Sequence, residues 1–301
     1  MISPRLPLEL ITSIFDILAT QNEWDTIRAC SLLSSHYTLL ARQYLFSTVT
    51  LKLGRYISIR DVVRRVQGLC RFLQTNTYIT RCIKTLEILD TYPVYDSQWI
   101  TQQSCLPHFI SLLGNVQSCT FGCEVGYLAW SSFSPKLQTS LKQLFISPQL
   151  RSLSLRNLGL VPEVILRNPV IRCLYLNHVS FSSSDLLHDG TESQHDDSQY
   201  FSPDIRDTQL IYLNIRTFSI ENTDSALRLM KSQGKNLKII KWRCWEGASP
   251  SPPSNMKGYS NKFQMLNRTL ARAFPVRSIS VSPHLSKNFP SGSRLETLDE
   301  I

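Results

Sequence analysis

Cationic, tyrosine and asparagine side chains recur at matching places in four segments of the second half of the chain, where they alternate with large apolar residues. Guanidinium groups bind carboxylate or phosphate groups through paired hydrogen bonds, and tyrosine and arginine are the usual anchors of protein interfaces. The residues that the alternation places on one surface are Arg156, Tyr175, Asn177, Tyr212, Asn214, Arg216, Lys241 and Arg243. We therefore expect this surface to bind an acidic or phosphorylated segment of a target protein. The alternative is that it is only the solvated side of a sheet.

No residue pattern in the sequence is typical of a catalytic or metal site. The sequence lacks the Gly-x-Ser-x-Gly elbow, the glycine-rich phosphate loops and the His-Glu-x-x-His helix. Its eight cysteines include no Cys-x-x-Cys pair and mostly lie in apolar runs, which favours reduced thiols over a disulfide framework. His188 and His195 lie among aspartates, but their spacing matches no rigid metal site. We expect a protein that is not an enzyme and that needs no cofactor.

The elements that position the recurring side chains are seven segments with the apolar pattern L-x-x-L-x-L. They begin at Ile83, Val116, Leu150, Ile171, Leu210, Leu237 and Val276. Because strand side chains alternate, the fourth and sixth positions would point into a core, and the third, fifth and seventh positions away from it. Helix-like stretches lie between segments, at residues 106–113, 224–231 and 262–274. A single strand–helix unit cannot bury its apolar face, so we predict that the units stack into a curved parallel sheet.

Stacking of this kind would align equivalent positions of neighbouring strands about 5 Å apart. One expected row contains Arg156, Asn177, Arg216 and Arg243, and the row beside it contains Tyr175, Asn214 and Lys241. The alternative for this part of the chain is an α/β sheet domain with ordinary crossover helices.

The first fifty residues carry three short runs with helical periodicity. Pro7 suits the first position of a helix, and apolar residues recur at spacings of three and four from Leu10 to Leu18. The residues suited to cap the second and third helices are Asp25, Thr26, Ser34 and Ser35. Three short helices are too few to bury such broad apolar stripes, so part of this surface must cover the next domain or a partner.

The same region contains the runs Leu6-Pro7-Leu8-Glu9-Leu10, Ile14-Phe15-Asp16-Ile17-Leu18, Ile27-Arg28-Ala29-Cys30-Ser31-Leu32 and Tyr44-Leu45-Phe46. Together they resemble the F-box motif in its fungal form, over residues 4–50. F-box units bind the Skp adaptor of cullin-based ubiquitin ligases, so the resemblance implies contact or core roles for Leu6, Pro7, Leu10, Ile14, Leu18, Ile27 and Leu33. Trp24-Asp25-Thr26 stands where many F-boxes have an Asp-Leu pair, which bears on the start of the second helix. The alternative is an ordinary three-helix cap on the sheet.

The repeated segments resemble the leucine-rich repeats that some F-box proteins carry, with two departures. The repeat length varies, and the ninth position, usually Asn or Cys in that family, holds Leu158, Val179 and Phe218 in three segments. The asparagine ladder that stiffens regular repeats is therefore not expected here.

These observations predict an α/β protein in three parts. A three-helix F-box-like unit would occupy residues 1–52, and an irregular leucine-rich-repeat solenoid with a parallel curved sheet would occupy residues 53–285. A flexible tail would follow at residues 286–301. An acidic loop at 182–199 and a proline-rich loop at 248–260 would interrupt the solenoid.

The 301-residue chain has a formal net charge of +9, and residues 201–301, with 15 basic and 8 acidic groups, contribute +7 of it. No signal peptide or membrane-spanning apolar run is visible, so we expect a protein of the cytoplasm or nucleus without a membrane partner. The resemblance implies a substrate-recruiting adaptor that binds the Skp adaptor, through it a cullin, and a target protein. The alternatives are a scaffold that no longer contacts the Skp adaptor and, less favoured, a nucleic-acid binder that uses the basic C-terminal third.

Overall fold

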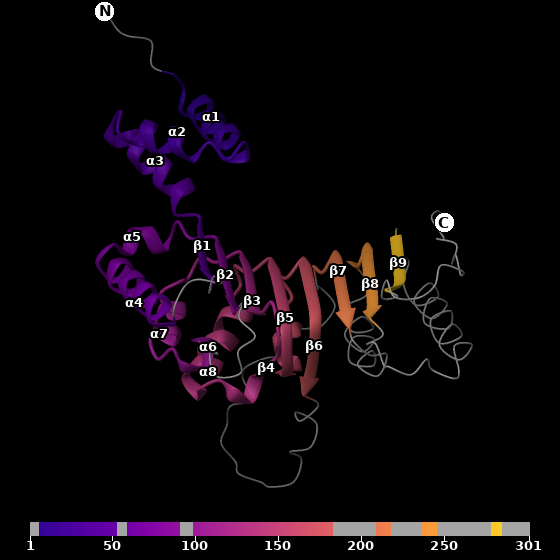
Figure 1. The fold of residues 1–301 in the computed structure, drawn as a ribbon. Coiled ribbons are helices and arrows are strands. Elements are labelled where there is room, and N and C mark those ends of the chain that lie inside the picture. Colours follow the sequence, from indigo (N-terminus) through magenta and orange to yellow (C-terminus); the bar gives the residue numbers. More distant parts are fainter. Residues whose placement is uncertain are drawn as a thin grey trace, which may run out of the picture.

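The computed structural model describes residues 6–52, 59–90, 99–182, 209–217, 236–245 and 278–284. Its architecture is mixed α/β. An N-terminal group of helices precedes a curved parallel sheet, and further helices pack against one face of that sheet (Figure 1). The predicted features that lie outside the described residues are the helices at 224–231 and 262–274, the loop after Ser182, the loop at 248–260 and the tail at 286–301.

The N-terminal group is formed by α1 (Leu8–Thr20), α2 (Trp24–Ser31) and α3 (Ser35–Leu45). Pro7 occupies the N-cap of α1, one residue before the helical position expected for it, and its carbonyl accepts hydrogen bonds from the N–H groups of Leu10 and Ile11. The Ser34 side chain accepts a hydrogen bond of 3.3 Å from the Tyr37 N–H, which confirms the expected cap of α3.

The predicted start of α2 was wrong. The helix begins at Trp24 with Glu23 at its N-cap, so Asp25 and Thr26 lie in the first turn and do not cap it. The Asp25 carboxylate forms an ion pair of 2.7 Å with Arg28, one turn further along. An acidic side chain is also favourable in the first turn, because it lies near the positive end of the helix dipole. An aspartate therefore suits both the N-cap and the first turn of a helix, and sequence alone did not distinguish the two positions.

Eight parallel strands follow chain order along the main path of the sheet, and the short strand β4 pairs with β5. The strands are β1 (Thr48–Lys52), β2 (Thr85–Asp90), β3 (Ser118–Cys123), β4 (Leu128–Ala129), β5 (Ser152–Pro162), β6 (Cys173–Ser182), β7 (Tyr212–Thr217), β8 (Ile239–Trp245) and β9 (Ser278–His284). Each of the seven predicted segments supplies one strand of the main path, and Figure 1 shows these strands side by side in that order.

The register aligns the seven segments position by position. Leu86 of β2 pairs with Cys119 of β3, which pairs with Leu153 of β5, and the same alignment continues to β9. The fourth and sixth positions whose side chains are described are all buried, as the alternation predicts. The parallel sheet expected from the repeated pattern is therefore present.

The first strand, β1, was not predicted. Its Val49 and Leu51 pair with residues of β2 and, together with Phe46, they repeat the L-x-x-L-x-L spacing. Phe46 is also the last residue of the F-box-like runs, so this eighth instance of the pattern was hidden by the resemblance. The sheet begins at Thr48, which places the end of the helical group before the predicted boundary at residue 52.

The helices after β1 are α4 (Ile59–Thr75), α5 (Thr77–Thr80), α6 (Trp99–Gln102), α7 (Leu106–Ser111) and α8 (Pro135–Phe145), with short 3-10 turns at Trp130–Ser132 and Glu163–Arg167. The helix predicted at 106–113 is α7, whereas α4 and α8 were not predicted. Phe121 of β3 lies edge-on to Phe133 and Phe145, with ring centroids 5.6 and 6.1 Å away. Val66 of α4 and Phe109 of α7 are buried in the same core, so these helices cover the apolar face of the sheet.

The helical group and the sheet have separate cores and meet through α3 and the start of β1. The rings of Phe46 and Phe72 lie 6.1 Å apart, and the guanidinium of Arg42 lies 5.1 Å from the centre of the Tyr78 ring. The Ser47 carbonyl accepts hydrogen bonds from the backbone of the residues that lead into β2. In Figure 1 the helical group accordingly stands beyond the β1 end of the sheet.

Candidate interaction surfaces

Helix α1 has two apolar stripes, and only one of them packs against its own chain. Ile11 and Phe15 are buried against α2 and α3. Leu10, Ile14 and Ile17, which are spaced by four and three residues, are 52%, 45% and 55% exposed. Residues with this spacing share one side of a helix. We call this exposed stripe, with Leu6 at its N-terminal end, the α1 face.

The core that holds the helical group together is small. Its buried apolar residues are Ile11, Phe15, Ile27 and Ala41. The Tyr44 hydroxyl of α3 donates a hydrogen bond of 2.8 Å to the Asp16 carboxylate of α1, and its ring lies 5.7 Å from that of Phe15. Burial, together with the adjacent Asp16 carboxylate, raises the pKa of Tyr44 to about 12, so the hydroxyl remains a donor.

The structure places the residues with expected adaptor contacts in two environments. Leu6, Pro7, Leu10, Ile14 and Leu33 are exposed, Leu18 is half-buried, and Ile27 is fully buried in the small core. Ile27 is thus a core residue and not a contact residue. Exposed apolar residues of the helical group that were not among the expected contact or core residues are Leu8, Ile17, Trp24, Leu32 and Leu39. Helical spacing from Leu10 and Ile14 was the signal that identified Ile17.

The second candidate surface lies on the face of the sheet opposite its apolar core. The rings of Tyr175 on β6 and Tyr212 on β7 approach to 5.1 Å, and the Lys241 ammonium of β8 lies 5.8 Å from the centre of the Tyr212 ring. The Asn214 amide donates a hydrogen bond of 3.3 Å to the Tyr212 hydroxyl. Arg216 and Lys241 are exposed on the same face of the sheet. We call these five residues the aromatic–cationic patch.

The two expected rows are present in the register of the strands. Arg156 pairs with Asn177, Asn177 with Arg216, and Arg216 with Arg243. The row beside it pairs Tyr175 with Asn214 and Asn214 with Lys241. Arg156 is only half exposed, and the side chain of Arg243 is not among those that the structure describes.

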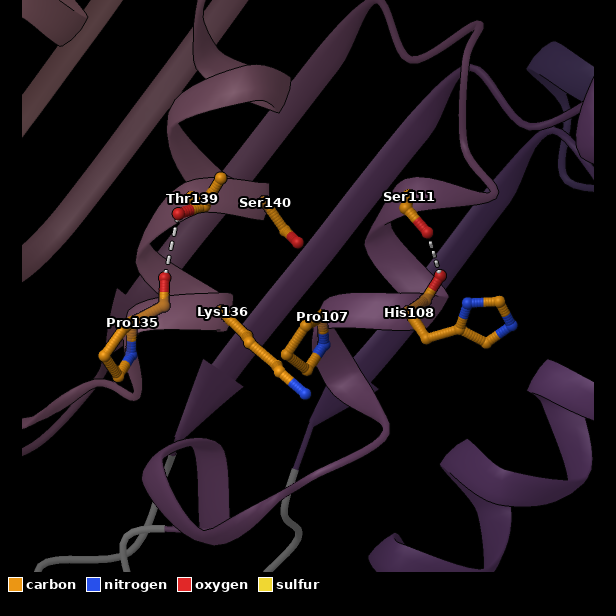
Figure 2. Close-up of a pocket in the computed structure, with 7 residues that line it drawn as sticks. All are labelled: Pro107, His108, Ser111, Pro135, Lys136, Thr139 and Ser140. Carbon is orange, nitrogen blue, oxygen red and sulfur yellow. Dashed lines mark hydrogen bonds between the residues drawn. The ribbon is translucent and has the colours of Figure 1, made fainter.

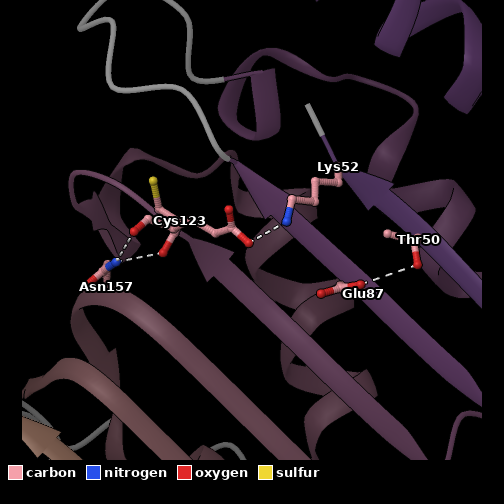
Figure 3. A network of polar contacts seen from close by, with 6 residues as sticks. Thr50, Lys52, Glu87, Cys123 and Asn157 are labelled. Atoms are coloured by element: carbon pink, nitrogen blue, oxygen red, sulfur yellow. Dashed lines mark hydrogen bonds and ion pairs between the residues drawn. The ribbon is translucent and has the colours of Figure 1, made fainter. Parts of the chain in front are cut away.

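A polar network occupies the carboxyl ends of the first strands (Figure 3). Lys52 of β1 forms an ion pair of 2.5 Å with Glu124, and Thr50 donates a hydrogen bond of 3.3 Å to Glu87. The buried Asn157 amide donates to the carbonyl oxygens of Cys123 and Glu124, at 2.7 and 3.3 Å. The charged groups at this end of the sheet therefore already have partners within the chain.

Asn157 also bears on the apolar ninth position of the β5 repeat. Its backbone has φ 50°, a left-handed conformation that asparagine tolerates, and the next residue, Leu158, is buried. The asparagine that bonds β5 to the carbonyls of Cys123 and Glu124 thus lies at the eighth position of its repeat, one residue before the expected ninth position. Regular repeats carry this asparagine at the ninth position, so the one at the eighth position was not predicted.

A shallow groove of about 420 Å³ lies between α7 and α8 on the helical side of the molecule (Figure 2). Its lining residues are Pro107, His108, Ser111, Pro135, Lys136, Thr139 and Ser140. The hydroxyls of Ser111 and Thr139 donate to the carbonyls of His108 and Pro135 in their own helices, at 2.7 and 2.9 Å. Two of the hydroxyl groups that line the groove are therefore already hydrogen-bonded within their own helices.

Comparisons of the chain with models of protein families, with curated proteins and with solved structures found no significant match. The α1 face and the aromatic–cationic patch are therefore the features of this chain that bear on its function. Within the described part of the chain, no helix is long and apolar enough to cross a membrane.

The buried thiols of the core are poor nucleophiles. Burial raises the pKa of the Cys119 thiol to about 12 and that of Cys70 to about 11. A thiol reacts as its thiolate, so both side chains stay protonated at neutral pH and act as small apolar groups. Among the described residues, no three His, Cys, Asp or Glu side chains are grouped in a way that could hold a metal ion.

We expect His178 to make folding stability depend on pH. Burial and the nearby Arg216 lower the pKa of His178 from 6.5 to about 4. In this pH interval the unfolded chain binds a proton that the folded chain does not, so the free energy of unfolding falls as the pH drops from 6.5 towards 4. His178→Asn suits the backbone φ of 54° and should flatten this dependence. Urea unfolding of both proteins across this range is the test, and equal slopes would contradict the assignment.

Proposed function

We propose that the chain is the substrate-recruiting subunit of a Skp–cullin–F-box ubiquitin ligase. The helical group would dock on the Skp adaptor, and an irregular leucine-rich-repeat solenoid would hold a target protein. The observation that carries the proposal is the α1 face, an exposed apolar stripe on a unit whose described residues include four buried apolar side chains.

The energetics of the α1 face support a protein partner. Covering the exposed half of a leucine or isoleucine side chain contributes on the order of 1 kcal/mol. Leu10, Ile14 and Ile17 share one side of the helix, so a single groove on a partner can cover all three. Leu32 and Leu33, which are 86% and 71% exposed, extend the apolar surface to the turn after α2. Apolar surface as large as this on a small unit is typical of an interaction site.

The sheet supports the second half of the proposal. Eight strands in chain order, with the buried positions of each repeat aligned from strand to strand, are the arrangement expected of stacked repeats. The third and fifth positions lie on the open face, which is the usual binding surface of such proteins, whereas the seventh position is buried in β2 (Leu89) and in β3 (Gly122). In this proposal the chain catalyses nothing itself. It works in the cytoplasm or nucleus and brings a target near the ubiquitin-charged enzyme that the cullin carries.

Co-expression of the full-length chain with a Skp adaptor tests the proposal. We expect the two proteins to co-purify as a stable complex through size-exclusion chromatography, and the complex to bind a cullin. A folded chain that elutes alone, without the adaptor, would contradict the ligase function. Such a chain would instead fit a scaffold that binds other proteins through its sheet.

A further inference from the structure

The open face of the sheet differs strongly between its two ends. In the row that contains Tyr175, the first strands present Thr50, Glu87, Thr120 and Ser154. These are small or acidic side chains, and the Glu87 carboxylate accepts a hydrogen bond from the Thr50 hydroxyl. The same row then continues with a tyrosine, an asparagine and a lysine on β6, β7 and β8. In this row, the large aromatic and cationic groups thus lie on the C-terminal strands.

The cations at this end have no acidic partner among the described residues. The ion pairs among the described residues involve Arg28, Lys52 and Arg64, which lie on α2, β1 and α4, and none involves Arg216 or Lys241. Both of these side chains are exposed: Lys241 lies over the ring of Tyr212, and Arg216 lies four residues further along the same strand as Tyr212. An exposed cation beside an aromatic platform favours a ligand with both an anionic and an apolar group.

We infer that the aromatic–cationic patch binds an extended acidic segment of the target protein, with carboxylates at Arg216 and Lys241 and an apolar or aromatic side chain on the Tyr175–Tyr212 pair. The inference rests on the proposed function only in assigning the segment to a ligase target. The charge complementarity itself is a property of the patch.

The spacing of the cations favours several carboxylates over one phosphate. Arg156, Arg216 and Lys241 lie on β5, β7 and β8, and neighbouring strands are about 4.8 Å apart. Asn177 separates Arg156 from Arg216, so these two positive charges do not meet at one point. An extended peptide presents side chains on one side about every 6.6–6.8 Å, which suits a series of carboxylates. A single phosphate would be best held by arginines that meet at one oxygen cluster.

Fluorescence anisotropy with labelled peptides and the full-length chain tests this inference. The probes are a peptide of repeating Glu-Ser-Glu-Tyr, the same peptide with glutamine for glutamate, and the glutamine peptide with one phosphoserine. We expect the glutamate peptide to bind about tenfold more tightly than either of the others, with an affinity that falls as salt is added. The double substitution Arg216→Glu and Lys241→Glu should remove this preference.

The matched control is Lys136→Glu with Lys142→Glu, which makes the same charge change on exposed positions of α8, across the molecule. This variant should bind the glutamate peptide as the unchanged chain does. Equal binding of the glutamate and glutamine peptides, tighter binding of the phosphoserine peptide, or equal losses in the two double variants would each overturn the inference. Displacement of the glutamate peptide by generic RNA at low salt would do so as well, because the patch would then be a phosphate-backbone site.

Failure of this inference and failure of the proposed function are distinguishable. The patch lies on β6, β7 and β8, whereas the α1 face lies in a helical group with its own core. We expect the Arg216→Glu and Lys241→Glu variant to co-purify with the Skp adaptor as the unchanged chain does. If the chain failed to bind the adaptor, the peptide measurement would still test the patch. If it failed to bind the peptide, co-purification with the adaptor would still test the proposed function.

Discussion

Replacement of both Leu10 and Ile14 by glutamate is expected to weaken binding to the Skp adaptor by at least about a hundredfold. The two side chains are 52% and 45% exposed and lie one turn apart on the α1 face. An adaptor groove that covers them would lose two apolar contacts and would have to desolvate two carboxylates without partners. Both residues point away from the small core, so the helical group itself should still fold. Isothermal titration of the purified variant with the adaptor measures the change.

Two further variants separate a lost contact from a lost fold. Ile146→Glu with Val164→Glu replaces apolar residues that are 42% and 41% exposed in the sheet part of the chain, and it should leave adaptor binding unchanged. Ile27→Ala removes a fully buried residue of the small core and should cost about 2–5 kcal/mol of stability, so its loss of binding would be accompanied by lost helicity. Undiminished adaptor binding by the Leu10→Glu and Ile14→Glu variant would remove the α1 face from the interface.

The strands of the sheet were largely predictable because each one repeats the same constraint. Apolar residues at the fourth and sixth positions must reach the core, and neighbouring strands must pair in one register, so seven weak patterns reinforce one another. The helices carry no such mutual constraint. Helix α4 buries Val62, Val66 and Leu73 at helical spacing, but arginines fill its outer side and dilute its apolar pattern. It was therefore missed, while the more apolar α7 was predicted.

The candidate surfaces were predictable to a similar degree and for the same reason. The row through Arg156, Asn177 and Arg216 follows from register alone. The ring contact between Tyr175 and Tyr212 does not, since these residues are diagonal neighbours on adjacent strands and side-chain conformations decide whether they meet. In the helical group, a motif assigns Ile27 and Leu10 the same importance, and only burial separates the core residue from the exposed one.

The sheet has one position where a single methyl group should disrupt it. We expect Gly122→Ala to lower the free energy of unfolding by about 3 kcal/mol. Gly122 of β3 has φ 139°, which side chains rarely adopt, and it pairs with Arg156 of β5. A Cβ atom added there would lie 2.0 Å from the Arg156 carbonyl oxygen. Because the obstacle is backbone and not a flexible side chain, the two strands would have to separate to admit it.

Gly68 provides the matched comparison, because it lies inside α4 with no atom within 4 Å of an added Cβ. Gly68→Ala should raise the free energy of unfolding by about 0.5–1 kcal/mol through helix propensity alone. Urea unfolding followed by the fluorescence of the buried Trp99 and Trp130 reports on the sheet for both variants. If the two substitutions change stability by the same amount and sign, the close approach of β3 and β5 is wrong. The helical group has a separate core, so Gly122→Ala should still bind the Skp adaptor under conditions where the sheet remains folded.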